Sequence, residues 1–239
     1  MKIIAHRGDS ANHPENTPAS WAGANAAGAD AIEADVRFLA DGTGICTHDP
    51  TLERLFARPE RADALTLDQL RELEKEDSGI GLLVDVLSNV VAGRAVVLDL
   101  KDESPRALDL VWKYIETNVL EALRHLVIVA CHSKETAMFF GAKHQITVLG
   151  FMPNRNDGAA FHETGATIIR LWESDVCPRR VAKLKALGAE VWVTTGAGAT
   201  GRQTGDTDDV SLRFLSDAGI DGVLVNDVLF AKAILEGCT

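Results

Sequence analysis

Acidic, basic and histidine side chains occur in and just after short apolar segments of this chain, in a combination suited to phosphate chemistry. They are His6, Arg7, Glu33, Asp35, His48, Asp99 and Lys101. Because side chains alternate along a β-strand, Glu33 and Asp35 point to the same face of one strand. The same spacing puts Asp99 and Lys101 on a common face of another strand. The sequence therefore predicts carboxylates that converge with cations beside them.

Three carboxylates gathered away from water repel one another unless a cation neutralises them. Oxygen ligands suit one divalent cation, Mg²⁺ or Ca²⁺, better than zinc, so the expected metal ligands are Glu33, Asp35 and Asp99. Arg7 and Lys101 would then bind a substrate phosphate that also contacts the ion. The sequence predicts a small-molecule phosphate ester as the substrate.

Two histidines near this cluster are candidates for proton transfer. An imidazole titrates near neutral pH, so His6 and His48 could serve as general base and general acid on opposite sides of the phosphorus atom. Trp192, in a later apolar segment, is a candidate substrate-binding residue, although a tryptophan in a strand is more often part of the core. The remaining histidines are expected to have no catalytic role; they are His13, His125, His132, His144 and His162.

Eight short apolar segments rich in Ile and Val have the composition of strands buried on both faces of a parallel sheet. They cover residues 3–6, 31–36, 95–100, 127–131, 146–150, 167–171, 190–194 and 222–225. Helical patterns lie between most of them, at residues 18–27, 105–119, 134–140, 176–187, 208–218 and 228–235. This alternation predicts an α/β fold, a (β/α)8 TIM barrel, whose active site lies at the carboxyl ends of the strands.

The long interval after the second strand departs from this alternation. Asp41-Gly42 is a strong hairpin signal between residues 36–39 and 43–48, and the returning arm would bring His48 roughly opposite Asp35. We expect the following segment, about residues 50–93, to be a short insertion with a charged helix over residues 67–75. Residues 1–239 would then form a single domain.

Composition and charge exclude several classes of protein. Lys+Arg 24 against Asp+Glu 35 gives a net charge of −11, which argues against nucleic acid or an anionic membrane as a partner. The cysteines at positions 46, 131, 177 and 238 have no CxxC spacing and are expected to be isolated, reduced thiols. The apolar run before His6 is too short for a signal peptide, so we expect a cytoplasmic protein without stable membrane association. The sequence leaves the oligomeric state open.

The ordered motifs of the first fifty residues closely resemble those of the glycerophosphodiester phosphodiesterase family. They are His6-Arg7-Gly8, Pro14-Glu15-Asn16-Thr17, Gly28-Ala29-Asp30, Glu33-x-Asp35-Val36, Asp41-Gly42 and His48-Asp49. The resemblance implies a metal-dependent (β/α)8 barrel that cleaves glycerophosphodiesters to sn-glycerol 3-phosphate and an alcohol. It implies an acid/base pair of His6 and His48, and it places Asn16 and Thr17 in a mainly structural role.

The resemblance also implies functions for the charged residues, with some departures from the family pattern. Glu33 and Asp35 correspond to metal ligands, and Arg7 and Lys101 to phosphate contacts. Asp99 stands where the family usually has a glutamate, one methylene longer. The closing motif of the family reads Asn226-Asp227-Val228 in this chain. These departures leave the phosphate chemistry intact and the head group of the substrate open.

Other activities stay open at this point. A lysophospholipase D or sphingomyelinase D type of phosphodiesterase would need an apolar groove, which Phe38, Leu39 and Phe56 could line. A non-catalytic barrel that only binds a phosphate ligand would not need two titrating histidines. The nucleophile is also open between water and the 2-hydroxyl of the substrate glycerol, with proximity favouring the intramolecular attack and a cyclic phosphate.

Overall fold

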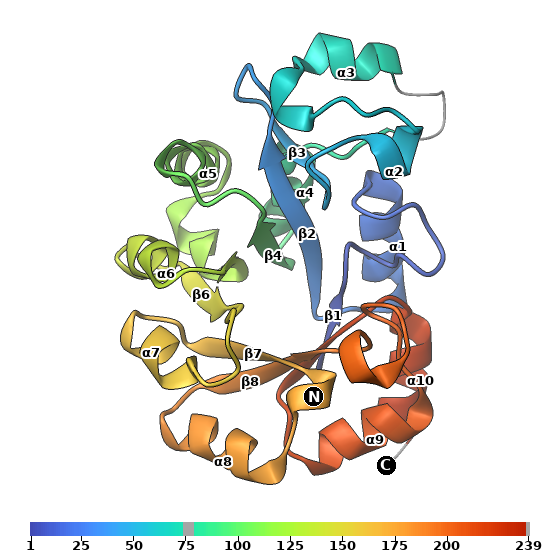
Figure 1. Cartoon of the computed structure of the whole chain (residues 1–239), viewed down its shortest axis with the longest axis vertical. Helices are drawn as coiled ribbons and strands as arrows, with labels where there is room; N and C mark the ends of the chain where they lie inside the picture. The colour runs from blue at the N-terminus through green and yellow to red at the C-terminus, as the bar shows by residue number, and fades with distance from the viewer. Residues whose placement is uncertain (74–78, 238–239) are drawn as a thin grey trace.

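The computed structural model describes residues 1–73 and 79–237, and its strands form a barrel surrounded by helices (Figure 1). The barrel strands are neighbours in the order β1, β9, β8, β7, β6, β5, β4 and β2, and pairing of β1 with β2 closes the ring. The strands are β1 (Lys2–Ala5), β2 (Ala31–Phe38), β4 (Ala95–Leu100), β5 (Val127–Cys131), β6 (Thr147–Gly150), β7 (Ile168–Trp172), β8 (Glu190–Thr194) and β9 (Gly222–Val225). The predicted TIM barrel and its predicted strands are confirmed.

Helices connect the strands and cover the outside of the barrel. They are α1 (Pro18–Ala27), α4 (Leu83–Val91), α5 (Pro105–Asn118), α6 (Lys134–Gly141), α7 (Gly158–Glu163), α8 (Pro178–Ala186), α9 (Asp209–Asp217) and α10 (Val228–Glu236). The predicted helical segments match these helices, except that α4 and α7 were not predicted. α1 begins after Thr17 because the Thr17 side chain accepts from the amide of Ser20 and the Ser20 hydroxyl accepts from the amide of Thr17.

The hairpin predicted at Asp41-Gly42 is present. β3 (Gly44–Cys46) pairs antiparallel with β2, and its register continues to Thr47, whose amide donates to the carbonyl of Asp35 at 3.0 Å. This hydrogen bond brings the loop that starts at His48 to the carboxyl end of β2. The hairpin therefore delivers a residue from outside the barrel strands to the predicted active-site end.

The segment after the hairpin forms a small cap with an apolar cluster of its own. It contains α2 (Glu53–Phe56), a 3-10 turn η1 (Ala62–Ala64) and α3 (Leu67–Leu73), and Figure 1 shows it at one end of the molecule. The buried members of this cluster are Leu39, Ile45, Leu52, Ala62, Leu70 and Ile80. α3 confirms the start of the predicted charged helix, whose last two positions, 74 and 75, lie outside the described residues.

The insertion is shorter than expected because its last part belongs to the barrel. α4 packs against β4, and its buried side chains are part of the main core. They are Leu83, Val86, Leu87 and Val90. α4 is thus the helix that connects the second and third parallel strands. That the whole chain forms a single domain stays a prediction.

Alternation along the strands gives the barrel interior an apolar bottom and a polar top. Inward-facing residues near the amino ends of the strands form an apolar cluster that includes Ile4, Ala31, Val97, Ile168 and Trp192. Two residues further along the same strands, the inward positions hold polar side chains, namely His6, Glu33, Asp99, Arg170 and Thr194. The polar groups of the barrel interior that could act on a ligand therefore lie toward the carboxyl end of the barrel.

In the described part of the chain, no helix has the length and apolar character needed to cross a membrane. Cys46, Cys131 and Cys177 are free thiols, as expected, and Cys238 lies outside the described residues.

A substitution at Gly8, in the turn after β1, tests how tightly this turn packs against Ser20. Gly8 has φ +81°, and a Cβ atom there would lie 2.3 Å from the Ser20 hydroxyl oxygen and 2.7 Å from the Ser20 backbone carbon. We expect Gly8→Ala to lower the free energy of unfolding by more than the roughly 1–2 kcal/mol that a left-handed alanine costs. Gly93→Ala is the matched control, because Gly93 has φ +79° with nothing within 4 Å of the added Cβ. Urea denaturation of both variants measures the difference, and equal losses would contradict the steric argument.

Candidate functional site

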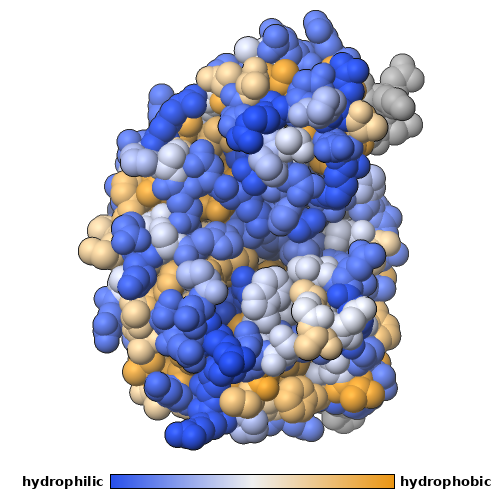
Figure 2. Space-filling model, in the orientation of Figure 1, coloured by the Kyte–Doolittle hydropathy of each residue, from blue (hydrophilic) through white to orange (hydrophobic). Residues whose placement is uncertain are grey.

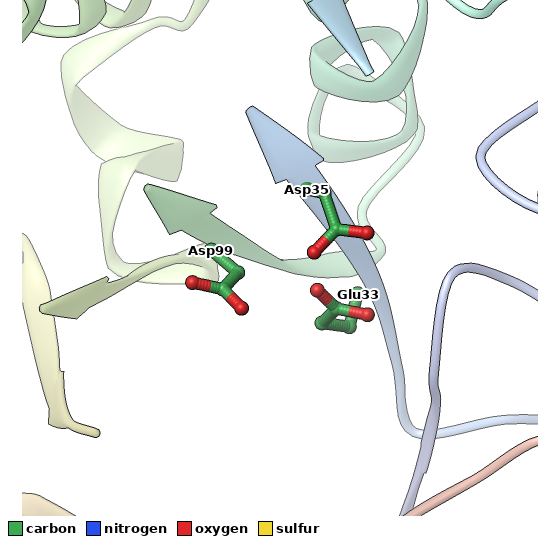
Figure 3. A group of neighbouring side chains, drawn as sticks. All are labelled: Glu33, Asp35 and Asp99. Carbon is green, nitrogen blue, oxygen red and sulfur yellow. The ribbon is translucent and has the colours of Figure 1, made fainter. Parts of the chain in front are cut away.

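Three acidic side chains meet inside the barrel near the carboxyl ends of β2 and β4. Glu33, Asp35 and Asp99 are buried, and each offers an oxygen within 4.8 Å of the other two. β2 and β4 are adjacent parallel strands with Asp35 opposite Asp99 in register. Figure 3 shows the carboxylates turned toward a common space, two from β2 and one from β4. The structure thus brings the predicted carboxylates together.

The loop after β1 holds the two carboxylates of β2. The amide of Arg7 donates to Oε2 of Glu33 at 2.7 Å. Nδ2 of Asn16 donates to Oδ2 of Asp35 at 2.8 Å, and Oδ1 of Asn16 accepts from the amide of Asp35 at 3.1 Å. Arg7 and Asn16 both have φ 58°, a left-handed conformation that costs energy for residues other than glycine. The strained backbone of this loop therefore positions the amide of Arg7 and the side chain of Asn16 around the carboxylates.

Asp99 contacts side chains from its own strand and from the next. Nζ of Lys101 lies 2.6 Å from Oδ2 of Asp99 and 3.0 Å from Oδ1 of Asp35. Nε2 of His132 lies 2.6 Å from Oδ1 of Asp99, and the His132 ring stands edge-on to Phe151. β5 ends at Cys131 beside β4, so the next residue faces Asp99. His132, which we expected to lie apart from the chemistry, belongs to the site.

Glu33 is the least compensated of the three carboxylates. Burial raises the pKa of Glu33 well above its usual range, and the charges of Asp35 and Asp99 raise it further. Burial also acts to raise the pKa of Asp35, but Lys101 and Arg7 bring it below its usual value. Nε of Arg7 lies 3.0 Å from Oδ2 of Asp35, an ion pair without the geometry of a hydrogen bond.

Oε1 of Glu33 is buried and has no hydrogen-bond partner among the described residues. A cation between the carboxylates would supply the missing partner and offset their mutual repulsion. Three carboxylates and no cysteine form a donor set suited to a hard divalent ion. The residues present therefore fit a site for such an ion.

His6, directly after β1, is held in one tautomer. Its Nδ1 lies 2.8 Å from Oδ1 of Asn226. Nδ2 of Asn226 donates to the carbonyl of Thr204 and to Oδ1 of Asp206, both at 2.9 Å, which fixes the amide oxygen toward His6. Nδ1 of His6 therefore carries the proton and Nε2 holds a lone pair. Burial lowers the pKa of His6, and the charge of Arg7 lowers it further, so the neutral form is favoured at pH 7.

His48 is oriented by residues from the hairpin loop and the insertion. Its Nδ1 lies 2.8 Å from Oδ1 of Asp49. Nε of Arg54, from α2, donates to Oδ2 of Asp49 at 2.5 Å, and the same guanidinium donates to Oε1 of Glu15 at 2.7 Å. Partial burial acts to raise the pKa of Asp49, but hydrogen bonds with His48 and Arg54 keep it below its usual value. Asp49 and Arg54 thus hold the Nδ1 side of His48, and the residue lines the cavity.

The site opens into a cavity of about 410 Å³ at the carboxyl end of the barrel. Figure 2 shows the molecule hollowed near its middle, with hydrophilic residues on the side of the hairpin and the insertion. The predicted residues that line the cavity are His6, Arg7, Glu33, His48, Asp99 and Lys101. The lining residues that were not predicted include His132, Phe151, Arg170 and Trp172.

Trp192 does not lie where we expected. It is buried, and its indole nitrogen donates to Oε2 of Glu190 at 3.1 Å, near the amino end of β8. It belongs to the apolar cluster at the bottom of the barrel, because alternation along β8 puts Thr194, and not Trp192, at the level of the cavity. The structure therefore does not bring Trp192 to the cavity with the other predicted residues. Aromatic residues do line the cavity, but they are Phe151 and Trp172, which ends β7.

Comparison with known proteins identifies relatives of this chain. A sequence model of the Glycerophosphoryl diester phosphodiesterase family matches residues 6–229. A glycerophosphodiester phosphodiesterase of Caldanaerobacter subterraneus is 42% identical over 78 residues, 33% of this chain and 31% of that protein. The chain thus aligns with less than a third of the length of the first curated relatives it matches.

Solved structures share the fold over nearly the whole chain. A phosphodiesterase of Oleispira antarctica, in complex with the product sn-glycerol-3-phosphate, superposes with a TM-score of 0.83 at 19% identity, covering 99% of this chain and 97% of that one. A glycerophosphodiester phosphodiesterase of Thermotoga maritima gives a TM-score of 0.77 at 22% identity, covering 95% of both chains. At these identities the likeness establishes the TIM-barrel fold.

Neutralising Glu33 tests whether repulsion within the carboxylate cluster destabilises the metal-free protein. In excess chelator, we expect Glu33→Gln to raise the free energy of unfolding by about 1–3 kcal/mol, because the amide removes a buried charge and can still accept from the Arg7 amide. The variant should also lose most of the stabilisation that Mg²⁺ or Ca²⁺ gives to the wild type. Thermal unfolding with and without the ion measures both effects. Glu190→Gln, which removes a charge outside the cluster, is the control, and an equal response of the two variants would refute a destabilising repulsion at Glu33.

Proposed function

The chain belongs to the glycerophosphoryl diester phosphodiesterase family, and we propose that it hydrolyses glycerophosphodiesters to sn-glycerol 3-phosphate and an alcohol. The observation that carries this proposal is the convergence of three buried carboxylates and two histidines on one cavity. Hydrolysis forms one P–O bond to the nucleophile and breaks the P–O bond to the alcohol, which needs one proton removed and one supplied. The two histidines match these two tasks.

In the proposed enzyme, Glu33, Asp35 and Asp99 hold one divalent cation, Mg²⁺ or Ca²⁺. When bound, such an ion polarises a phosphoryl oxygen and offsets the negative charge that develops during phosphoryl transfer. Arg7 and Lys101, which already pair with Asp35, bind the phosphate from the same side of the cavity. The phosphate would thereby be oriented between the two histidines.

His6 is the proposed general base and His48 the proposed general acid. The neutral His6 ring has its lone pair on Nε2, because Asn226 occupies the Nδ1 side. The carboxylate of Asp49 holds the Nδ1 side of the His48 ring, and Nε2 of His48 is the proposed donor to the departing alcohol. His6 would take its proton either from water or from the 2-hydroxyl of the glycerol, and the second route gives a cyclic phosphate.

An acyl-chain groove of the kind needed by a lysophospholipase D finds no support in the three residues considered for it. Phe38 is buried in the main core, Leu39 is buried in the cluster of the insertion, and Phe56 packs against the same cluster. The small-molecule diester therefore remains the preferred substrate class. The cytoplasmic location expected from the sequence stays a prediction.

The proposed activity can be tested directly with the purified chain. Incubation with glycerophosphoglycerol and Mg²⁺ or Ca²⁺ should release sn-glycerol 3-phosphate, and phosphorus NMR should reveal any cyclic intermediate. Excess EDTA should abolish the reaction, and adding back the ion should restore it, because the carboxylates repel the phosphate without a cation. Full activity after exhaustive chelation would refute the metal requirement, and absence of product from a panel of glycerophosphodiesters would refute the function.

Removing either histidine tests the acid/base assignment. We expect His6→Ala and His48→Ala each to lower kcat by roughly 100- to 10,000-fold, the usual contribution of a general acid or base, with a much smaller change in KM. His144→Ala, at an exposed position away from the cavity, is the control and should leave kcat unchanged. The acidic limb of the kcat/KM profile should lie below pH 6.5, because burial lowers the pKa of His6 from that value. A variant that keeps more than about half of the wild-type kcat would overturn the role of that histidine.

A further inference from the structure

One cavity residue is a buried cation that the proposed reaction does not use. Arg170 lies in the middle of β7, is 6% exposed and lines the cavity. Its guanidinium carbon lies 4.3 Å from the centroid of the Phe151 ring and 3.9 Å from that of the Trp172 ring. The two aromatic side chains therefore hold the guanidinium in place.

Arg170 differs from the other cations of the cavity in forming no ion pair with any carboxylate that the structure describes. Arg7 and Lys101 each lie within 3.1 Å of two carboxylates. Among the described residues, no carboxylate oxygen lies within 4 Å of the Arg170 guanidinium, and its Nε has no hydrogen-bond partner. Burial lowers the pKa of Arg170 to about 10, although the charges of Asp99 and Asp175 act to raise it, and the group stays charged at pH 7. These two carboxylates act only from a distance, and a buried charge without a direct ion pair is costly, so such a group in a cavity points to an anionic ligand.

The position of Arg170 separates it from the reacting phosphate. In the closed ring of strands, β7 lies four strands from β2 in either direction, so Arg170 rises from the wall opposite Glu33 and Asp35. Figure 1 shows β2 and β7 on different sides of the barrel. The phosphate is assigned to the side of β2 and β4, where Arg7 and Lys101 already lie. Arg170 therefore faces a part of the substrate away from that phosphate.

We propose that Arg170 is a specificity residue that binds an anionic group, a carboxylate or a second phosphate, on the alcohol arm of the diester. The inference rests on the proposed function and names the class of head group. The aromatic faces of Phe151 and Trp172, which could otherwise bind a quaternary ammonium group, are already in contact with Arg170. A cationic alcohol such as choline or ethanolamine is repelled by the same guanidinium.

The test uses three diesters of matched length that differ only in the charge of the alcohol. They are the glycerophosphate esters of 3-hydroxypropionate (anionic), 1-propanol (neutral) and ethanolamine (cationic). The wild type should give the highest kcat/KM with the anionic ester and the lowest with the cationic one. Arg170→Met, which keeps an apolar stem between the rings, should lower the ratio of anionic to cationic kcat/KM by roughly 10- to 100-fold, the contribution of a charged hydrogen bond. Arg170→Lys should keep the order of preference.

Two further measurements control for the change in net charge and for effects on turnover. Arg179→Met changes the net charge equally at an exposed site on α8 and should leave the ratio unchanged. Binding of each ester to His48→Ala and to the double variant His48→Ala/Arg170→Met, followed by thermal shift, reports recognition without turnover. The anionic ester should stabilise the first protein more than the second.

The outcomes separate this inference from the proposed function. An equal loss on all three esters in Arg170→Met would mean that Arg170 binds a part common to them, and an unchanged ratio would mean that it binds none of them; either result overturns the inference. If the wild type cleaves none of the three esters, the proposed function fails. The thermal shift then still decides about Arg170, because a stabilisation by the anionic ester that needs Arg170 supports the site and its absence refutes it.

Discussion

Electrostatic repulsion among three buried carboxylates is the constraint around which this end of the barrel is organised. Glu33, Asp35 and Asp99 stay close only because the surrounding chain supplies donors and cations to them. The donors come from the loop after β1, from the amide side chain of Asn16 and from His132. One buried oxygen of Glu33 is left without a partner among the described residues, which makes an external cation the natural complement of the cluster.

The barrel distributes charge unevenly around its cavity. On the side of β2 and β4, cations and carboxylates alternate so closely that each basic group is neutralised. On the side of β7, a single guanidinium lies between two aromatic rings. An anion that enters the cavity thus meets two different environments, one built to share it with a metal ion and one with a free charge. The two sides of the barrel axis therefore determine which end of an anionic substrate lies where.

Local patterns in the sequence predicted the part of the site that neighbouring residues build. The alternation of side chains along a strand was enough to predict that Glu33 and Asp35 share one face. The succession of strand-length apolar segments was enough to predict the barrel. Arg170 could not be found in this way, because it lies inside an apolar run and its aromatic partners include Phe151, which follows a different strand, β6. Trp192 was misplaced because the sequence does not show which level of the barrel an inward side chain occupies.

Two helices, α4 and α7, were not predicted from the sequence, and each omission has a physical reason. α4 starts without a Ser, Thr, Asp or Asn at its N-cap position, which holds Leu82. α7 has only six residues, fewer than a periodic pattern needs to be recognised. His132 and Asn226 each act through a partner far away in the sequence, and only the closed sheet shows the pairing.

That pairing of first and last strands has a consequence for synthesis of the protein. Asn226 is synthesised 220 residues after His6, the residue that it orients. At the usual rate of about 5–20 residues per second, the nascent chain spends on the order of ten seconds or more with the proposed base unoriented and the barrel open. The contact that orients His6 therefore forms only when β9 inserts between β1 and β8. Closure of the ring and orientation of the proposed base are thus one and the same folding event.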